Sequence, residues 1–90
     1  MFNCKILFTN ANGSPVDRLG GQLIANKTVE DNYYYPDSTI QIESWGCEFF
    51  DKFPDHELVV YSESIVGGFK ILYSVDELKE FVSLSIWEAG

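Results

Sequence analysis

Near the C-terminal end of the chain, two short runs of β-branched and aromatic residues predict a β-hairpin. Glu57–Ser62 has the sequence ELVVYS and Phe69–Tyr73 has the sequence FKILY, and both compositions favour strands. Gly67 and Gly68 lie between the two runs, and a glycine pair readily takes the positive φ angles of a tight turn. The pattern therefore predicts two antiparallel strands.

A helix is predicted directly after the second of these strands. Ser74 can accept a hydrogen bond from the amide three residues on, and Glu77 can reach back to the Ser74 amide, which together form a capping box. Five apolar residues then recur at helical spacing: Val75, Leu78, Phe81, Val82 and Ile86. We expect the helix to continue to about Ile86, but Val82–Ile86 also alternates as a strand does, so both structures stay open for residues 83–88.

The first half of the chain favours further strands. Phe2–Thr9 alternates between two sides, which is typical of a half-buried strand. Gln22–Val29 and Thr39–Trp45 are predicted as two more strands, with Gly46 bending or bulging the second of them. Ser14–Asp17, which follows a predicted turn and contains a proline, is predicted as one turn of helix.

These elements predict an α+β fold in a single domain spanning residues 1–90. Its mainly antiparallel sheet has four to five strands, and a C-terminal helix packs on one face. The composition supports a folded core, because 46% of the residues are hydrophobic and 16% are aromatic. Disordered chains are poor in such residues, so we expect a folded, compact domain.

The sequence also bears on where the protein resides. It has neither a secretory signal nor an apolar stretch near the ~20 residues of a membrane span, so we expect a cytoplasmic protein, in the host cell's cytoplasm if a phage encodes it. Cys4 and Cys47 are the only cysteines and form no CxxC pair. We expect two reduced, buried thiols, with a disulfide as the alternative.

Charge is the most distinctive global property, with a net value of −8. Residues 1–29 carry three basic residues against one acid, a net charge of +2, whereas residues 30–90 carry thirteen acids against three lysines, a net charge of −10. A field of this sign disfavours direct binding to nucleic acid and favours basic partners.

Residues suited to catalysis or metal binding are few. His56 is the only histidine, and Cys47 lies nine residues before it, but the apolar surroundings of Cys47 favour a buried, inert thiol over a nucleophile. In an extended chain the side chain of His56 points away from those of Asp55 and Glu57, so the three residues do not converge on a metal. No cofactor motif is present, and we expect neither an enzyme, a cofactor nor a metal.

Two acidic segments rich in aromatic residues are the candidate binding surface. Tyrosine offers a large contact area at low entropic cost, and carboxylates complement arginine and lysine on a partner. Three consecutive tyrosines cannot all face one core, so we expect at least one to be exposed. The alternative is that the aromatic residues form core and the acids are merely solvated. The candidate residues are Glu30, Asp31, Tyr33, Tyr34, Tyr35, Asp37, Glu43, Glu48, Asp51, Asp55 and Glu57.

Tyr34-Tyr35-Pro36, with acids nearby, resembles the tyrosine-tyrosine-proline segment of the colicin DNase immunity proteins. Those proteins are acidic and plug a basic nuclease. They are also all-helical, which this sequence is not, so the resemblance implies neither a shared fold nor shared ancestry. It implies a class: small acidic proteins with exposed aromatic residues that occupy a cationic surface. Phage anti-restriction and anti-CRISPR proteins have the same general character, and some mimic nucleic acid.

The sequence thus leads to one functional hypothesis and one alternative. We expect a small, non-enzymatic inhibitor whose carboxylates stand in for phosphates on the basic surface of a nucleic-acid-binding protein or nuclease. The alternative is a general protein–protein interaction domain or subunit whose acidic charge serves solubility. A steep dependence of partner binding on salt concentration distinguishes the first from the second.

Overall fold

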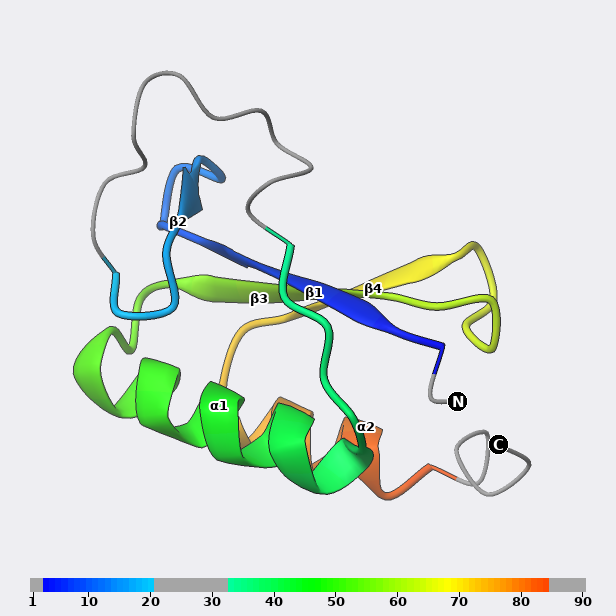
Figure 1. The fold of residues 1–90 in the computed structure, drawn as a ribbon. Helices are drawn as coiled ribbons and strands as arrows, with labels where there is room; N and C mark the ends of the chain where they lie inside the picture. Colours follow the sequence, from blue (N-terminus) through cyan, green and yellow to red (C-terminus); the bar gives the residue numbers. More distant parts are fainter. Residues whose placement is uncertain (1–2, 21–32, 85–90) are drawn as a thin grey trace.

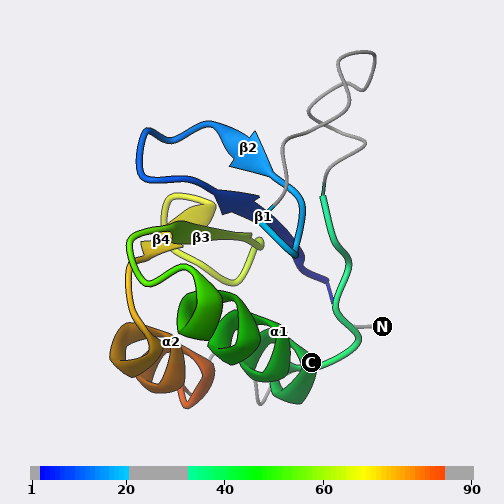
Figure 2. The same cartoon turned by 90° about the vertical axis from the view of Figure 1, so that its left-hand side faces the viewer.

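A computed structural model describes residues 3–20 and 33–84, and it has a four-stranded antiparallel sheet with two helices on one face (Figure 1). The elements in chain order are β1 (Lys5–Thr9), β2 (Pro15–Val16), α1 (Thr39–Lys52), β3 (Glu57–Tyr61), β4 (Phe69–Leu72) and α2 (Val75–Val82). The order of strands in the sheet is β2-β1-β3-β4. Figure 2 shows α1 and α2 side by side beneath the sheet. The predicted α+β class, with a C-terminal helix, is confirmed.

The core lies between the sheet and the two helices. β1 pairs with β3 along all five residues, and Ile6 lies opposite Val60 while Phe8 lies opposite Leu58. These four side chains point toward the helices and are fully buried, whereas the alternate residues face the other side of the sheet, which no described helix covers. We call that side the helix-free face. The largest fully buried side chains are Phe8, Phe49, Ile6, Ile42, Leu58, Leu72, Leu78 and Val60.

The predicted hairpin and the predicted start of the last helix are confirmed. β3 and β4 pair from Leu58 opposite Leu72 to Tyr61 opposite Phe69, and the connecting glycines take φ angles of 85° and 88°. Ser74 caps α2 through a 3.2 Å hydrogen bond from the Glu77 amide to its Oγ.

The end of α2 was predicted too late. The helix stops at Val82, where the Ser83 hydroxyl donates a 2.7 Å hydrogen bond to the Glu80 carbonyl and closes the last turn. Ile86 and the predicted strand Gln22–Val29 lie outside the described residues.

The strand predicted for Thr39–Trp45 is wrong, because these residues begin the 14-residue helix α1. The Ser38 hydroxyl accepts a hydrogen bond from the Gln41 amide (3.3 Å), and the Gln41 side-chain oxygen accepts one from the Asp37 amide (2.7 Å). This is a capping arrangement on a serine and a glutamine three residues apart. The alternation that suggested a strand covers only the five residues 39–43, whereas the buried residues Ile42, Gly46, Phe49 and Phe50 follow helical spacing.

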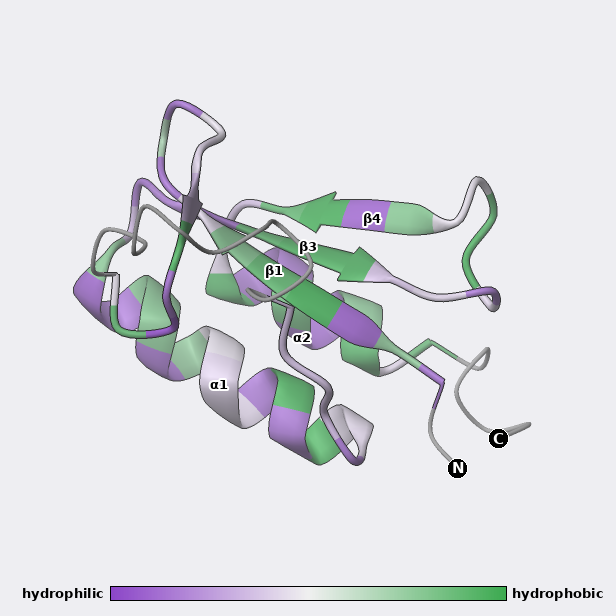
Figure 3. Cartoon of the chain, turned by 45° about the horizontal axis from the view of Figure 1, so that its top comes forward, coloured by the Kyte–Doolittle hydropathy of each residue, from purple (hydrophilic) through white to green (hydrophobic). Residues whose placement is uncertain are grey.

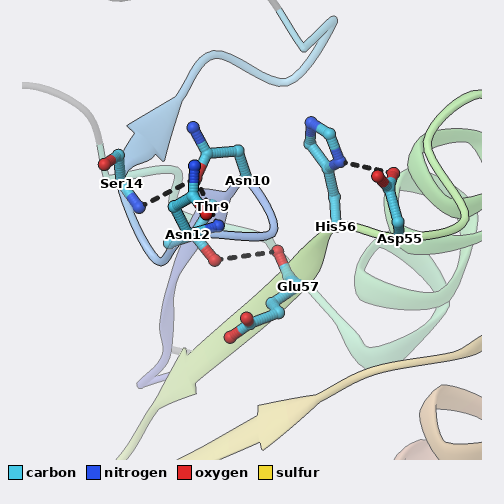
Figure 4. A network of polar contacts seen from close by, with 7 residues as sticks. All are labelled: Thr9, Asn10, Asn12, Ser14, Asp55, His56 and Glu57. Carbon is cyan, nitrogen blue, oxygen red and sulfur yellow. Dashed lines mark hydrogen bonds and ion pairs between the residues drawn. The ribbon is translucent and has the colours of Figure 1, made fainter.

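The helical turn predicted for Ser14–Asp17 is also wrong, since Pro15–Val16 forms β2 against the end of β1. The Asn10 side chain organises the preceding turn: its Oδ1 accepts hydrogen bonds from the amides of Asn12 (2.9 Å) and Ser14 (3.1 Å) (Figure 4). Gly13 completes the turn with a φ angle of 82°. The turn brings Pro15 and Val16 back alongside β1 at the edge of the sheet. Proline is tolerated there because an edge strand does not need every backbone N–H for pairing.

Gly46 neither bends nor bulges a strand; it allows the two helices to approach. It lies in the middle of α1 and is buried, and a Cβ atom at this position would overlap a methyl group of Leu78 in α2 and lie 3.3 Å from Leu58 Cδ2. Both leucines are fully buried and have little room to move. The close contact of α1 with α2 therefore requires glycine here.

Gly46→Ala is expected to lower the free energy of unfolding by about 1–3 kcal/mol, because overpacking outweighs the gain of up to about 1 kcal/mol in helix propensity. Denaturant unfolding monitored by circular dichroism measures the change. Ser44→Ala, on the exposed side of the same helix, is the control and should change stability by no more than about 0.5 kcal/mol. A Gly46→Ala variant as stable as the parent would contradict this account of the helix contact.

Candidate partner-binding surface

Carboxylates follow α1 along its whole length. Asp37 lies just before the capping residue, Glu43, Glu48 and Asp51 lie on the helix, and Asp55 lies in the turn after it. All are exposed except Glu43, which is half-buried. Glu48 and Asp51 lie on the outward side of α1, away from its buried residues, and Glu43 lies at the edge of that side. We call these five residues the α1 acidic row; at 1.5 Å per residue, the helix that carries it is about 21 Å long.

Most of this row has no basic neighbour. Arg18 approaches Glu48, with 3.6 Å between Nη1 and Oε2, and its guanidinium lies 5.6 Å from the centre of the Trp45 ring. Both charged side chains are substantially exposed, so the pair neutralises charge but adds little stability. Within residues 3–20 and 33–84, no other carboxylate on α1 forms an ion pair.

The second helix, α2, carries further exposed carboxylates, which were not among the predicted partner-binding residues. Asp76, Glu77 and Glu80 are exposed on α2, which packs beside α1 (Figure 2). Together the two helices carry six acids against Lys52 and Lys79. The outer side of the helical layer is therefore strongly negative. These three acids of α2 are visible in the sequence, but Glu77 was interpreted only as part of the helix cap, so none of them was predicted to belong to a binding surface.

Of the three consecutive tyrosines, Tyr34 has a structural role. Its backbone forms a two-way bridge with Ile6, in which the Ile6 amide donates to the Tyr34 carbonyl (2.8 Å) and the Tyr34 amide donates to the Ile6 carbonyl (2.9 Å). Its ring packs edge-on against Phe8, and its hydroxyl accepts a 3.0 Å hydrogen bond from the Arg18 amide. Tyr34 thus holds the segment 33–37 against the sheet.

Tyr33 and Tyr35, on either side of it, have different surroundings. Tyr33 is half-buried and packs edge-on against Tyr61, and the Lys5 ammonium lies 4.3 Å from the centre of its ring. Burial raises the pKa of the Tyr61 phenol, and the adjacent Tyr33 raises it further. Tyr35 is 65% exposed. The expectation that at least one of the three tyrosines is exposed is confirmed.

Tyr35 borders an open hollow of about 980 Å³. The hollow is lined by Tyr35, Pro36 and Asp37, by Lys5 at the start of β1, and by Tyr61 and Glu63 at and just after the end of β3. We call it the Tyr35 hollow. Its wall is fixed by the buried Ser62 side chain, whose hydroxyl donates a 2.9 Å hydrogen bond to the Asn3 carbonyl. Tyr35 and Asp37 were predicted from the acidic, aromatic pattern of their segment, whereas Glu63, in the hairpin loop, was not predicted.

Asp55, His56 and Glu57 do not form a common site (Figure 4). The His56 ring packs on Phe53, with 4.9 Å between ring centres, and its Nδ1 lies 2.9 Å from Asp55 Oδ1. This hydrogen bond lowers the pKa of the Asp55 carboxyl. Glu57 begins β3 opposite Thr9, and its position in the register places it on the helix-free face, away from the α1 acidic row. The structure does not describe the other two candidates, Glu30 and Asp31.

Within residues 3–20 and 33–84, no three His, Cys, Asp or Glu side chains are grouped so as to hold a metal ion. No helix in the same ranges is long and apolar enough to cross a membrane.

Comparisons with known proteins do not identify a relative. No protein-family model matches the chain, and neither the curated proteins nor the solved structures give a match. The α1 acidic row is therefore the main evidence that bears on function.

The two cysteines differ in environment, and their thiols should differ in reactivity. Neither cysteine forms a disulfide, and the prediction that both are buried holds for Cys4 but is wrong for Cys47, which is partly exposed. Burial raises the pKa of the Cys4 thiol from 9.0 to about 11. At pH 8 a thiol reagent should modify Cys47 quickly and Cys4 only as the protein unfolds. Mass spectrometry of Cys47→Ser should show loss of the fast reaction. Equal rates at both thiols would contradict the burial of Cys4.

The same shift in the pKa of Cys4 affects stability at alkaline pH. The thiol ionises near pH 9 in the unfolded chain but near pH 11 in the folded protein. Its contribution to stability is therefore complete below pH 9 and is lost as the pH rises toward 11. Cys4→Ala, compared with the parent across this range, should lose that part of the pH dependence.

Proposed function

We propose that this protein is a non-enzymatic inhibitor that covers the basic, nucleic-acid-binding surface of a partner protein. The α1 acidic row supports this proposal most directly. Three of its five carboxylates lie on one helix, and among the residues described only Glu48 on that helix has a basic partner. They would occupy positions that phosphates take in the partner's nucleic-acid complex.

The core determines the spacing of these charges. Ile42, Phe49 and Phe50 anchor α1 to the sheet, so the carboxylates on its other side keep fixed positions. Glu43 and Asp51 are two helical turns apart, about 12 Å along the axis. That distance spans three to four phosphates of one DNA strand at about 3.4 Å of rise each. Because the helix backbone is already ordered, docking on a cationic groove costs only the ordering of the side chains.

The unbalanced charge has a physical consequence for association. Six carboxylates on two adjacent helices repel one another, and a basic surface relieves that repulsion when it docks. Such a field steers a cationic partner into contact and raises the association rate, and salt screens the effect. The same field repels nucleic acid, so this protein would compete with DNA or RNA for the partner without binding either.

The helix-free face supports a second candidate, a general interaction domain. Figure 3 shows hydrophobic residues along β1, β3 and β4, and those that the register places on the helix-free face include Leu7 and Val59, which are buried, and Phe69, which is exposed. Phe69 and Tyr73 at its β4 edge are 50% and 53% exposed. An apolar docking partner on this face would bind with little dependence on salt, in contrast to a partner on the α1 acidic row.

The first proposal predicts that charge on α1 controls partner binding. After isolation of a partner by affinity capture, Glu43→Gln and Asp51→Asn should each weaken the complex by up to roughly five-fold at low salt, chiefly through slower association. Kinetic measurements at two salt concentrations, and competition with the partner's nucleic acid, provide the test.

The control for this experiment is Glu57→Gln, which removes the same charge from the helix-free face. It should leave the association rate nearly unchanged if position on α1 matters rather than total charge. Binding that is indifferent to salt and to both α1 variants, or a partner with a neutral or acidic contact surface, would remove the inhibitor proposal and favour the interaction domain.

A further inference from the structure

We infer that the Tyr35 hollow receives an arginine side chain from the basic partner. This inference rests on the proposed function, because it assigns a contact within that complex. It names a second point of attachment beside the α1 acidic row, at the end of the molecule where the segment 35–37 meets β1 and the end of β3.

The charges that line the hollow favour a cation. Asp37 and Glu63 enter it from two different segments, and both side chains are exposed. The Asp37 amide donates a 2.7 Å hydrogen bond to the Gln41 side chain, which fixes the backbone and leaves the carboxylate to the solvent. Across residues 3–20 and 33–84, neither carboxylate forms an ion pair. Two carboxylates against Lys5 give the lining a net charge of −1.

The aromatic rings beside the hollow already bind one cation. The Lys5 ammonium lies 4.3 Å from the centre of the Tyr33 ring and 5.7 Å from that of Tyr61, which is cation–π geometry. The rings of Tyr33 and Tyr61 therefore already have Lys5 as their cation. Tyr35 is 65% exposed and has no ring or cation contact within the described part of the chain, so its ring remains open to a second cation.

An arginine fits this combination better than a lysine. The planar guanidinium can stack on the Tyr35 ring and donate two parallel hydrogen bonds to one carboxylate, whereas an ammonium makes a point contact. The hollow is larger than a single side chain, so the backbone around the arginine also has room to enter. Hydrogen bonds from Ser62 to Asn3 and between Tyr34 and Ile6 hold the wall of the hollow in place. The wall therefore does not have to rearrange when an arginine enters.

The test uses the isolated protein and two capped tripeptides, Gly-Arg-Gly and Gly-Lys-Gly, in NMR titrations at low salt. The arginine peptide should bind more tightly and should shift the amide signals of Tyr35, Asp37 and Glu63 most. Tyr35→Ala should weaken its binding by about two- to five-fold, the contribution of an exposed cation–π contact. Tyr73→Ala removes a tyrosine that is 53% exposed but lies outside the hollow, so it should have no effect.

Charge variants separate the hollow from the rest of the acidic row, with which it shares Asp37. Asp37→Asn and Glu63→Gln should each weaken binding of the arginine peptide, while Asp51→Asn should not, because Asp51 does not line the hollow. Equal binding of the two peptides, shifts spread evenly over all acidic surfaces, or indifference to Tyr35→Ala would overturn the inference. Partner binding by the Glu43 and Asp51 variants would then still decide the proposed function, since neither residue lines the hollow.

Discussion

The pairing of β1 with its neighbours holds the two halves of this protein together. β1 lies between β2 and β3, and all five of its residues pair with β3, which comes about fifty residues later. Its residue Ile6 also forms the backbone bridge to Tyr34, and Phe8 packs against Phe49 of α1 with 4.6 Å between ring centres. The position of α1, and with it the acidic row, depends on this one strand, as does the segment that borders the Tyr35 hollow.

The sequence was most informative where local signals and burial agree. The hairpin of β3 and β4 and the start of α2 were predictable because strand-forming runs, glycines and a serine cap occur in one short segment. Thr39–Trp45 was mistaken for a strand because Ile40 and Ile42 alternate with polar residues. In the folded protein only Ile42 is buried, and Ile40 is 79% exposed. The serine and glutamine that cap α1 were the stronger signal, and they agree with the helical spacing of the residues that follow.

Charge could be read from the sequence, but its arrangement could not. Placing Glu43, Glu48 and Asp51 on a helix rather than a strand changes which of them share a surface. Adjacent, identical tyrosines cannot be distinguished by composition or periodicity. Tyr34 is held and Tyr35 is exposed because the bridge to Ile6, 28 residues away in the chain, decides which of them faces the core. Contacts at such separation leave no local trace in the sequence.

The two sides of α1 tolerate substitution differently, and Gly46 marks the side that does not tolerate it. The inner side admits no added atom, because Leu78 already fills the space that a side chain at position 46 would need. The outer side, from Ser44 to Asp51, carries exposed residues whose substitution leaves the core intact. Mutation can therefore change the charge and shape that this side of the helix presents to solvent while the packing of α1 on α2 stays constant.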